Sequence, residues 1–284
     1  MNAKSVDAQL KPEHNGQAGA YSIESHVMDA PAPENPPLTT APPPLPPRVW
    51  KFWGTTLWGL FVFGGMFLGQ LAVVIYFMLE RDAPDIASAI QVLGGGLTIA
   101  LSVITGLPGA LLTLWIAIRP TRTSFADYLA LRWTSWKSFA IGVAALALLV
   151  GVWDLVSRAF GREASPGFMG DVLKAAQAEG ALWLLVVAFC IAAPVSEELL
   201  ARGFLYRGWS ETALRPGGAI LLSSLAWTVL HLQYDWFFLC EVFSIGLLFG
   251  CLRYRYNSTW LTIVLHGLNN LAATLQTLWL TGQS

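Results

Sequence analysis

Charged side chains are scarce in this chain of 284 residues, where Asp, Glu, Lys and Arg together account for 12%. The formal net charge is -1 and no run of Lys or Arg occurs, so no basic surface for nucleic acid is expected. The three cysteines, Cys190, Cys240 and Cys251, have neither CxxC spacing nor the even number of a disulfide framework. We interpret them as small apolar core residues. No signal peptide is expected either, because a basic start followed by an apolar core is missing.

Hydrophobic residues, in contrast, make up 55% of the chain, which has 13 Trp and a mean hydropathy of +0.53. This composition leaves too little polar surface to cover a soluble globule of the same length. A membrane-spanning helix needs about 20 apolar residues. We therefore predict an all-α, polytopic transmembrane bundle of about seven to eight helices. The predicted spans are residues 53–79, 87–117, 138–157, 181–207, 217–232, 236–252 and 258–280.

Some of these segments are irregular. Residues 217–232 and 236–252 are short for a hydrocarbon core of about 30 Å, so we expect them to be tilted, buried or broken. An amphipathic stretch near 165–180 is expected at the membrane interface. Small residues that allow helices to pack closely occur at Gly65 with Gly69, at Gly246 with Gly250, and in the run Gly94, Gly95 and Gly96.

Two regions are predicted. Residues 1–49 contain "PAPENPPLTTAPPPLPP", which can form extended polyproline structure but cannot bury a core. This region is expected to be a disordered cytoplasmic tail, either solvated or bound by a proline-recognising domain. Residues 50–284 form the transmembrane domain.

Basic residues indicate the orientation in the membrane. Lys and Arg in short loops mark the cytoplasmic side of a membrane protein. They cluster at Arg48 and Lys51, in the loop 118–137, and at Arg253 and Arg255, which fall on one side if the spans alternate. We therefore predict a plasma membrane protein with a cytoplasmic N-terminus and a site that opens toward the cytoplasm. The sequence does not indicate an oligomeric state.

Several polar residues interrupt the last apolar segments. A charge at membrane depth costs roughly 2.5 to 3.5 kcal/mol on insertion scales, so such residues are candidates for function. Glu198 and Arg202 are four residues apart and can pair on one helix face, whereas Glu197 is rotated by about 100° from Glu198. The polar set consists of Glu197, Glu198 and Arg202 in the fourth span, His231 in the fifth, and His266, Asn269 and Asn270 in the last.

These residue types suit peptide hydrolysis by water. The reaction needs a base that takes a proton from water and donors that hold the oxyanion of the tetrahedral intermediate. Glu197 and His231 are candidates for the first role. His266 and Asn270 share a helix face and are candidates for the second. Helix lengths leave one difficulty, because at about 1.5 Å per residue Glu197 lies nearer the cytoplasmic face than His231 does. A longer or tilted fourth helix, or a displaced fifth, would remove it.

Three motifs resemble those of the CAAX-protease and bacteriocin-processing family of intramembrane glutamic endopeptidases. "EELLAR" matches EExxxR, "WTVLH" resembles FxxxH with Trp227 in place of the usual Phe, and "HGLNN" matches HxxxN. The resemblance covers residues 180–275. It implies that Glu197 activates water with help from His231, that His266 and Asn270 form the oxyanion hole, and that Glu198 and Arg202 support the site. The implied substrates are membrane-associated peptides or proteins, of prenylated or leader type.

Two alternatives stay open. Glu and His side chains are also ligands for zinc, although no HExxH motif is present and the candidates come from three different helices. A zinc-dependent hydrolase is therefore one alternative to an enzyme without a cofactor. The other is a non-catalytic membrane scaffold or immunity protein, which would bind peptides in the same cavity and tolerate Glu197→Gln.

Overall fold

The computed structural model describes residues 49–80, 85–162 and 167–282, and within these ranges all regular secondary structure is helical. The predicted all-α class is therefore confirmed, while the predicted tail lies outside the described residues. The helices are α1 (Phe52–Glu80), α2 (Ile86–Gly94), α3 (Gly96–Ile118), α4 (Phe125–Tyr128), α5 (Trp136–Ala159), α6 (Gly167–Ala178), α7 (Leu182–Val187), α8 (Ala193–Glu198), α9 (Tyr206–Ser210), α10 (Arg215–Val229), α11 (Trp236–Tyr256) and α12 (Thr259–Thr281).

Five helical segments of the described chain are long and apolar enough to cross a membrane: 52–80, 96–121, 136–159, 182–210 and 236–256. Each corresponds to a predicted span. The last predicted span forms α12, which has 23 residues but is not among the five. The predicted fifth span over 217–232 forms α10, which is short as expected, with 15 residues, but begins two residues earlier and ends before His231.

The predicted span 87–117 is divided into two helices. Asp85 caps the start of α2, and its carboxylate accepts a hydrogen bond from the Ser88 amide. Gly95 has an extended backbone conformation and separates α2 from α3. A side chain on Gly96 would collide with Ala176 of α6, so the glycine run allows close contact between helices, as predicted.

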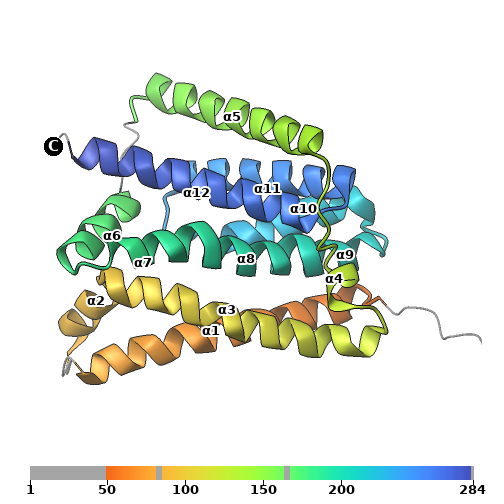
Figure 1. Cartoon of the computed structure of the whole chain (residues 1–284), viewed down its shortest axis with the longest axis horizontal. Helices are drawn as coiled ribbons and strands as arrows, with labels where there is room; N and C mark the ends of the chain where they lie inside the picture. The colour runs from red at the N-terminus through yellow and green to blue at the C-terminus, as the bar shows by residue number, and fades with distance from the viewer. Residues whose placement is uncertain (1–48, 81–84, 163–166, 283–284) are drawn as a thin grey trace, which may run out of the picture. The chain divides into compact units, whose positions relative to one another are not determined.

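Glycines also bring two helix pairs into close contact. A Cβ atom on Gly69 would collide with the Thr105 carbonyl of α3, and one on Gly250 would lie 2.7 Å from Ile220 of α10. In Figure 1, α1 and α3 run side by side. Small residues replace the hydrophobic driving force that is missing between helices in lipid.

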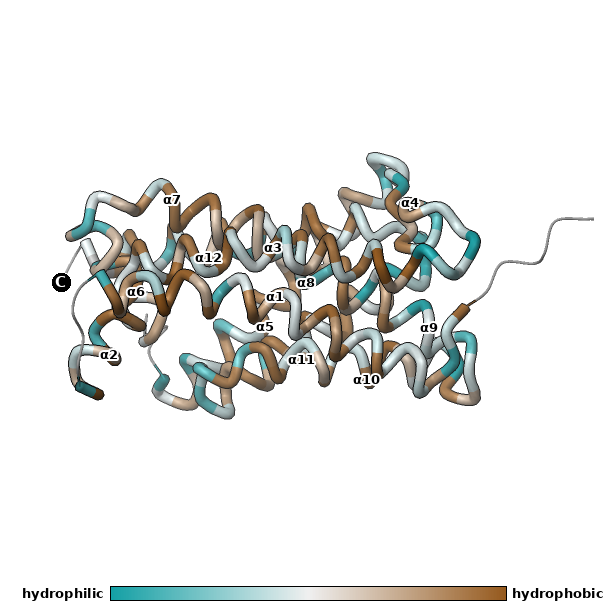
Figure 2. The backbone as a smooth tube through the Cα atoms, turned by 90° about the horizontal axis from the view of Figure 1, so that it is seen from below, coloured by the Kyte–Doolittle hydropathy of each residue, from teal (hydrophilic) through white to brown (hydrophobic). Residues whose placement is uncertain are grey.

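Figure 2 shows hydrophilic residues gathered toward the two ends of the bundle and hydrophobic residues between them. Exposed apolar side chains such as Trp53, Leu79, Trp136 and Phe160 cover the outer surface of the helices. An exposed surface of this size and composition fits contact with lipid rather than with water. The multi-pass membrane class predicted from the composition is thus confirmed.

The fourth span is one continuous helix with two wide turns. Residues 182–210 are helical throughout, but π-helical turns replace the α-helical pattern at Ala188–Ala192 and Leu199–Leu205. The two turns flank α8, which carries both glutamates. π-helical insertions are rare and occur frequently at functional sites. The helix also extends beyond the predicted end at residue 207, which places Glu197 near its middle.

Candidate active site

Glu197 projects from α8 toward α10. The indole Nε1 of Trp227 donates a hydrogen bond to Oε2 of Glu197 across 2.7 Å. The Glu197 side chain is 16% exposed and lies on the wall of a cavity whose volume is ≈ 770 Å³. Glu197 is therefore held at one oxygen but remains accessible from the cavity.

His231 lies in the turn that follows α10. Its Nδ1 is 3.1 Å from the Trp227 carbonyl, one turn earlier in the chain. Because a carbonyl only accepts, Nδ1 carries the proton and Nε2 of the neutral ring is an acceptor. Nε2 lies 3.9 Å from Oε2 of Glu197. The structure thus brings this predicted pair together, and the difficulty with helix lengths does not arise.

Glu198 points to the other side of α8 and forms a buried ion pair. Nη1 of Arg202 lies 2.8 Å from Oε1 of Glu198, and both side chains are 0% exposed. Arg202 also donates from Nη2 to the Gly246 carbonyl of α11 and stacks over the Trp227 ring, 4.6 Å from its centroid. The predicted pairing at a spacing of four residues is present, and it ties the fourth span to α10 and α11.

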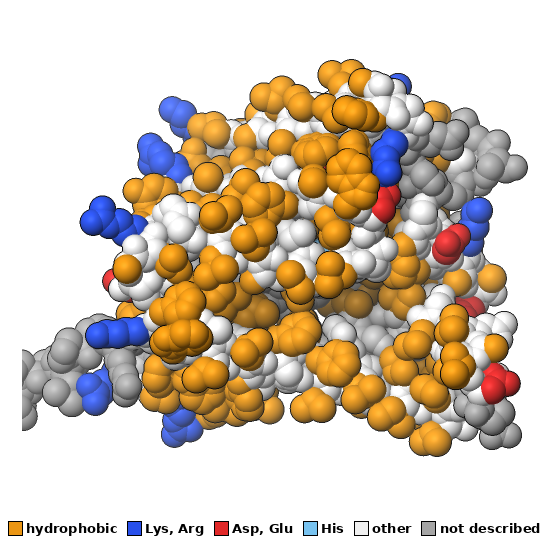
Figure 3. Space-filling view, turned by 180° about the vertical axis from the view of Figure 1, so that it is seen from behind, with side chains coloured by type: hydrophobic (Ala, Val, Ile, Leu, Met, Phe, Trp, Pro, Cys, Tyr) orange, Lys and Arg blue, Asp and Glu red, His pale blue; other side chains and the backbone are white. Residues whose placement is uncertain are grey.

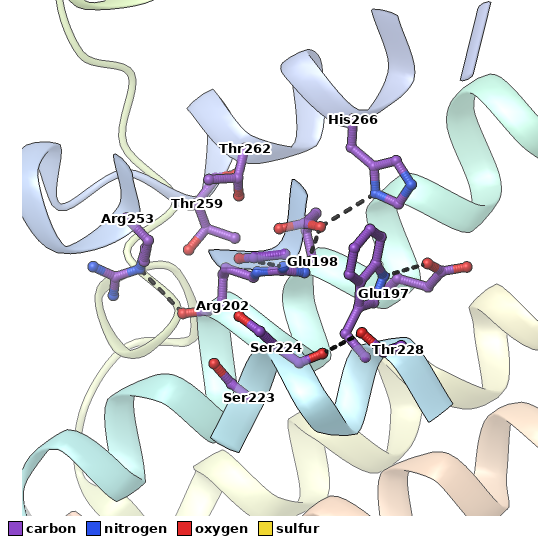
Figure 4. A network of polar contacts seen from close by, with 12 residues as sticks. Glu197, Glu198, Arg202, Ser223, Ser224, Thr228, Arg253, Thr259, Thr262 and His266 are labelled. Atoms are coloured by element: carbon purple, nitrogen blue, oxygen red, sulfur yellow. Dashed lines mark hydrogen bonds and ion pairs between the residues drawn. The ribbon is translucent and has the colours of Figure 1, made fainter. Parts of the chain in front are cut away.

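His266 of α12 contacts the same ion pair. Its Nδ1 lies 3.2 Å from Oε1 of Glu198, as Figure 4 shows. The imidazole also meets the Trp227 ring edge to face, with centroids 5.3 Å apart and planes at 89°. The ring is 2% exposed but forms part of the cavity wall. With Nδ1 directed at Glu198, Nε2 is the nitrogen that is available to a bound substrate.

Asn270 lies one turn after His266 and has a partner that the sequence did not indicate. Its amide nitrogen donates 2.9 Å to the carbonyl of Phe189, which belongs to the first π-helical turn. A π turn disturbs the regular pairing of carbonyls within a helix, and a side chain from another helix meets the carbonyl here. One N–H of Asn270 is used in this bond, and the second is available to a ligand.

The second π turn is fixed in the same way by a residue that sequence analysis missed. Nε of Arg253, near the end of α11, donates to the Arg202 carbonyl across 3.1 Å (Figure 4). Arg253 is 3% exposed. It was assigned to a cytoplasmic loop from its charge alone. No sequence signal distinguished it from Arg255, which is exposed.

Tyr234 is another cavity residue without a sequence signal. Its ring stacks on His231, with centroids 6.1 Å apart and planes at 21°. Burial raises the pKa of Tyr234 to about 12, and the charge of Glu197 acts in the same direction. The phenol therefore keeps its proton at neutral pH and is a hydrogen-bond donor in the cavity wall.

The geometry does not favour the zinc alternative. Among the described residues, no group of three or more His, Cys, Asp or Glu side chains is placed to hold a metal ion. Glu197 and His231 face the cavity, whereas His266 is directed at Glu198, which is already paired with Arg202. His266 is thus directed away from the pair formed by Glu197 and His231.

Comparison with known families supports the resemblance. Residues 179–272 match the family described as "Type II CAAX prenyl endopeptidase Rce1-like". No curated protein and no solved structure matches the chain significantly. The matched segment contains all three motifs and coincides with the predicted range 180–275, so the resemblance to the CAAX-protease family is confirmed over this segment. The match supports a membrane endopeptidase of the CAAX type in general.

Proposed function

We propose that this protein is an intramembrane endopeptidase of the plasma membrane in which Glu197, assisted by His231, activates water for attack on a peptide bond. The observation that carries the proposal is the distance of 3.9 Å between Oε2 of Glu197 and Nε2 of His231 at the wall of the cavity. Both atoms are acceptors in this arrangement, so they do not hydrogen-bond to each other directly. One water molecule can donate a hydrogen bond to each of them.

In the proposed reaction, the water oxygen forms a bond to the peptide carbonyl carbon while a water proton passes to Glu197. The carbonyl oxygen becomes an oxyanion, which needs donors at about 2.7–3.1 Å. The second N–H of Asn270 is one candidate donor. Nε2 of His266 is the other, and it can donate only when both nitrogens of the ring carry protons.

Collapse of the intermediate breaks the C–N bond. The leaving amine takes the proton from Glu197, directly or through His231, and the products are a carboxylic acid and an amine. Trp227 holds Oε2 of Glu197 in place during these transfers, and the Glu198–Arg202 pair positions α8 and His266. The substrate is a peptide or a membrane-anchored protein, and the cycle requires no metal.

Replacement of the four reacting residues tests this proposal. Glu197→Gln is nearly isosteric but cannot accept the water proton, so cleavage of a quenched fluorescent peptide library by purified protein should fall at least 10²-fold. His231→Gln, His266→Gln and Asn270→Ala should also reduce cleavage. Each variant should insert into the membrane and elute as the wild type does. Wild-type cleavage by Glu197→Gln would overturn the proposal.

The same preparations separate the alternatives. Chelators such as 1,10-phenanthroline should leave cleavage unchanged, whereas inhibition that added zinc reverses would favour the zinc hydrolase. A scaffold or immunity protein would retain its biological effect in cells that carry Glu197→Gln. An enzyme would lose the effect together with the cleavage.

A further inference from the structure

The cavity extends from the candidate site toward one end of the bundle only. From Glu197 and His266 its wall continues along α5 to Ser157, along α12 to Thr277, and through Gly167–Met169 of α6. Among the described residues, none of those that line it belongs to the opposite end, formed by residues 119–135, 207–215 and 253–260. Figure 1 shows α6 and the end of α12 together at one end, and α4 and α9 at the other.

The two ends carry opposite charge. The end at which α4 and α9 lie is basic, and the end that the cavity reaches is acidic. On the face drawn in Figure 3, most Lys and Arg side chains lie toward one end, and most Asp and Glu side chains lie toward the other, where a few basic side chains also occur. The basic end includes Lys51, Arg119, Arg122, Arg132, Lys137 and Arg215, and the acidic end includes Glu80, Asp85, Asp171, Glu179, Asp235 and Glu241.

Basic residues at the acidic end do not balance this difference. Three described residues of this end are basic, Arg158, Arg162 and Lys174, and the two arginines each form an ion pair with a neighbouring acid, Asp154 at 2.9 Å and Asp235 at 2.9 Å. The distribution of Lys and Arg decides the orientation of a membrane protein, and their excess marks the cytoplasmic side. The basic end therefore belongs in the cytoplasm, in agreement with the orientation predicted from the sequence.

We infer that substrates reach Glu197 from the non-cytoplasmic side of the membrane. This inference rests on the proposed function and specifies where its substrates come from. It also departs from the expectation of a cytoplasmic opening, because the cavity and the basic end lie at opposite ends of the bundle. The cytoplasmic opening was predicted because the glutamates lie toward the cytoplasmic end of the fourth span. In the structure, the cavity instead follows the half of this span that precedes Glu197.

The walls of the cavity define the substrate class further. Much of the lining is apolar, with Phe63, Met66, Val103 and Phe168 from three different helices. A peptide segment with apolar side chains, exposed on the outer surface or partly inserted into the outer half of the bilayer, fits such a wall. A prenylated C-terminus that stays in the cytoplasm would not reach it.

Thiol labelling locates the cavity. Cys190, Cys240 and Cys251 are replaced by Ala, and single cysteines are introduced at Gln276, in the cavity wall, or at Lys137, at the basic end. A membrane-impermeant methanethiosulfonate reagent should modify Gln276→Cys in right-side-out vesicles and Lys137→Cys only in inverted vesicles. The reverse pattern would overturn the inference, whatever the catalytic mechanism.

Cleavage from each side tests access of the substrate. A library of quenched, membrane-impermeant apolar peptides should be cleaved by right-side-out vesicles at least tenfold faster than by inverted ones, with Glu197→Gln inactive in both. Faster cleavage by inverted vesicles, equal cleavage by both, or cleavage in detergent alone would overturn the inference while upholding the proposed function. No cleavage under any condition, including detergent, would refute the proposed function, and the labelling result would still locate the cavity.

Discussion

The indole Nε1 of Trp227 lies 2.7 Å from the Glu197 carboxylate, at the position where the family motif usually has Phe. A phenylalanine could fill the same space but could not donate this hydrogen bond. Trp227 also contacts His231, His266 and Arg202 through its ring. The aromatic residue of the second motif is thus part of the site and directly contacts the proposed base.

Trp227→Phe should therefore slow catalysis without unfolding the protein. A hydrogen bond to a charged group contributes about 1.5–3 kcal/mol, which corresponds to about a 10- to 100-fold fall in kcat. Steady-state cleavage kinetics measure this fall in kcat. Trp209→Phe is a matched control, because Trp209 is also buried and donates to Thr56 at 3.2 Å, away from the cavity. Equal losses in both variants would indicate a packing role only.

Asn270→Asp should abolish most activity although its shape is conserved. The substitution removes both N–H donors, so it loses the bond to the Phe189 carbonyl and the proposed contact with the oxyanion. Loss of one oxyanion donor costs on the order of 10²- to 10³-fold in rate. The expected result is a fall in kcat with little change in KM, measured with a single peptide substrate. A change confined to KM would assign Asn270 to substrate binding.

The buried pair Glu198–Arg202 should be more important for stability than any exposed pair. Removal of one partner leaves an uncompensated buried charge, so Glu198→Gln or Arg202→Met should each destabilise the protein by about 3–5 kcal/mol. Thermal unfolding in detergent measures this loss. The double variant Glu198→Leu/Arg202→Met should be less destabilised than either single change. Asp154→Asn, which breaks an exposed pair with Arg158, should cost about 0–1 kcal/mol.

Asp235 should stabilise α11 in a pH-dependent way. Burial alone would raise the pKa of Asp235, but hydrogen bonds from the Phe237 amide and from Arg162 outweigh it and hold the pKa below its usual value. A lowered pKa in the folded state means that the stabilisation is present above the usual pKa and is lost as the pH falls through the folded value. Asp235→Ala should cost about 0.5–2 kcal/mol near neutral pH.

This difference between wild type and Asp235→Ala should disappear once the carboxylate is protonated. Unfolding in detergent at about pH 7 and at about pH 2, well below the usual pKa of an aspartate, compares the two conditions. Arg162→Gln separates the contributions, because it removes the ion pair at 2.9 Å but keeps the helix cap. A constant difference between the two proteins at both pH values would contradict the assignment of a charged cap.

Much of the fold follows from the sequence because lipid leaves few alternatives. A long apolar run such as residues 138–157 must satisfy its backbone within one helix, and the structure has a helix there. Boundaries were harder to predict. Gly95 divides one predicted span, and α10 ends at Val229 although apolar residues continue to Leu232. Hydropathy responds to composition and not to the local backbone geometry that ends a helix.

The site could be predicted only in part. The spacing of Glu198 and Arg202 predicted their pairing correctly, because four residues correspond to about one turn. The indole bond from Trp227 could not be foreseen, since it depends on the rotation of α10 relative to α8. The π turns were missed for a related reason, since apolar periodicity does not reveal one additional residue within a helix.

The wide turns at 188–192 and 199–205 determine the directions in which the Glu197 and Glu198 side chains leave the helix. Consecutive helical residues differ by about 100° in direction, so a turn with an additional residue offsets everything beyond it by that angle. If the same residues followed ordinary α-helical turns, the part of the helix beyond the turn would be rotated by about that angle, and Glu197 would then leave the cavity wall. The number of residues in a single turn of the helix thus decides which of the two adjacent glutamates lines the cavity and which pairs with Arg202.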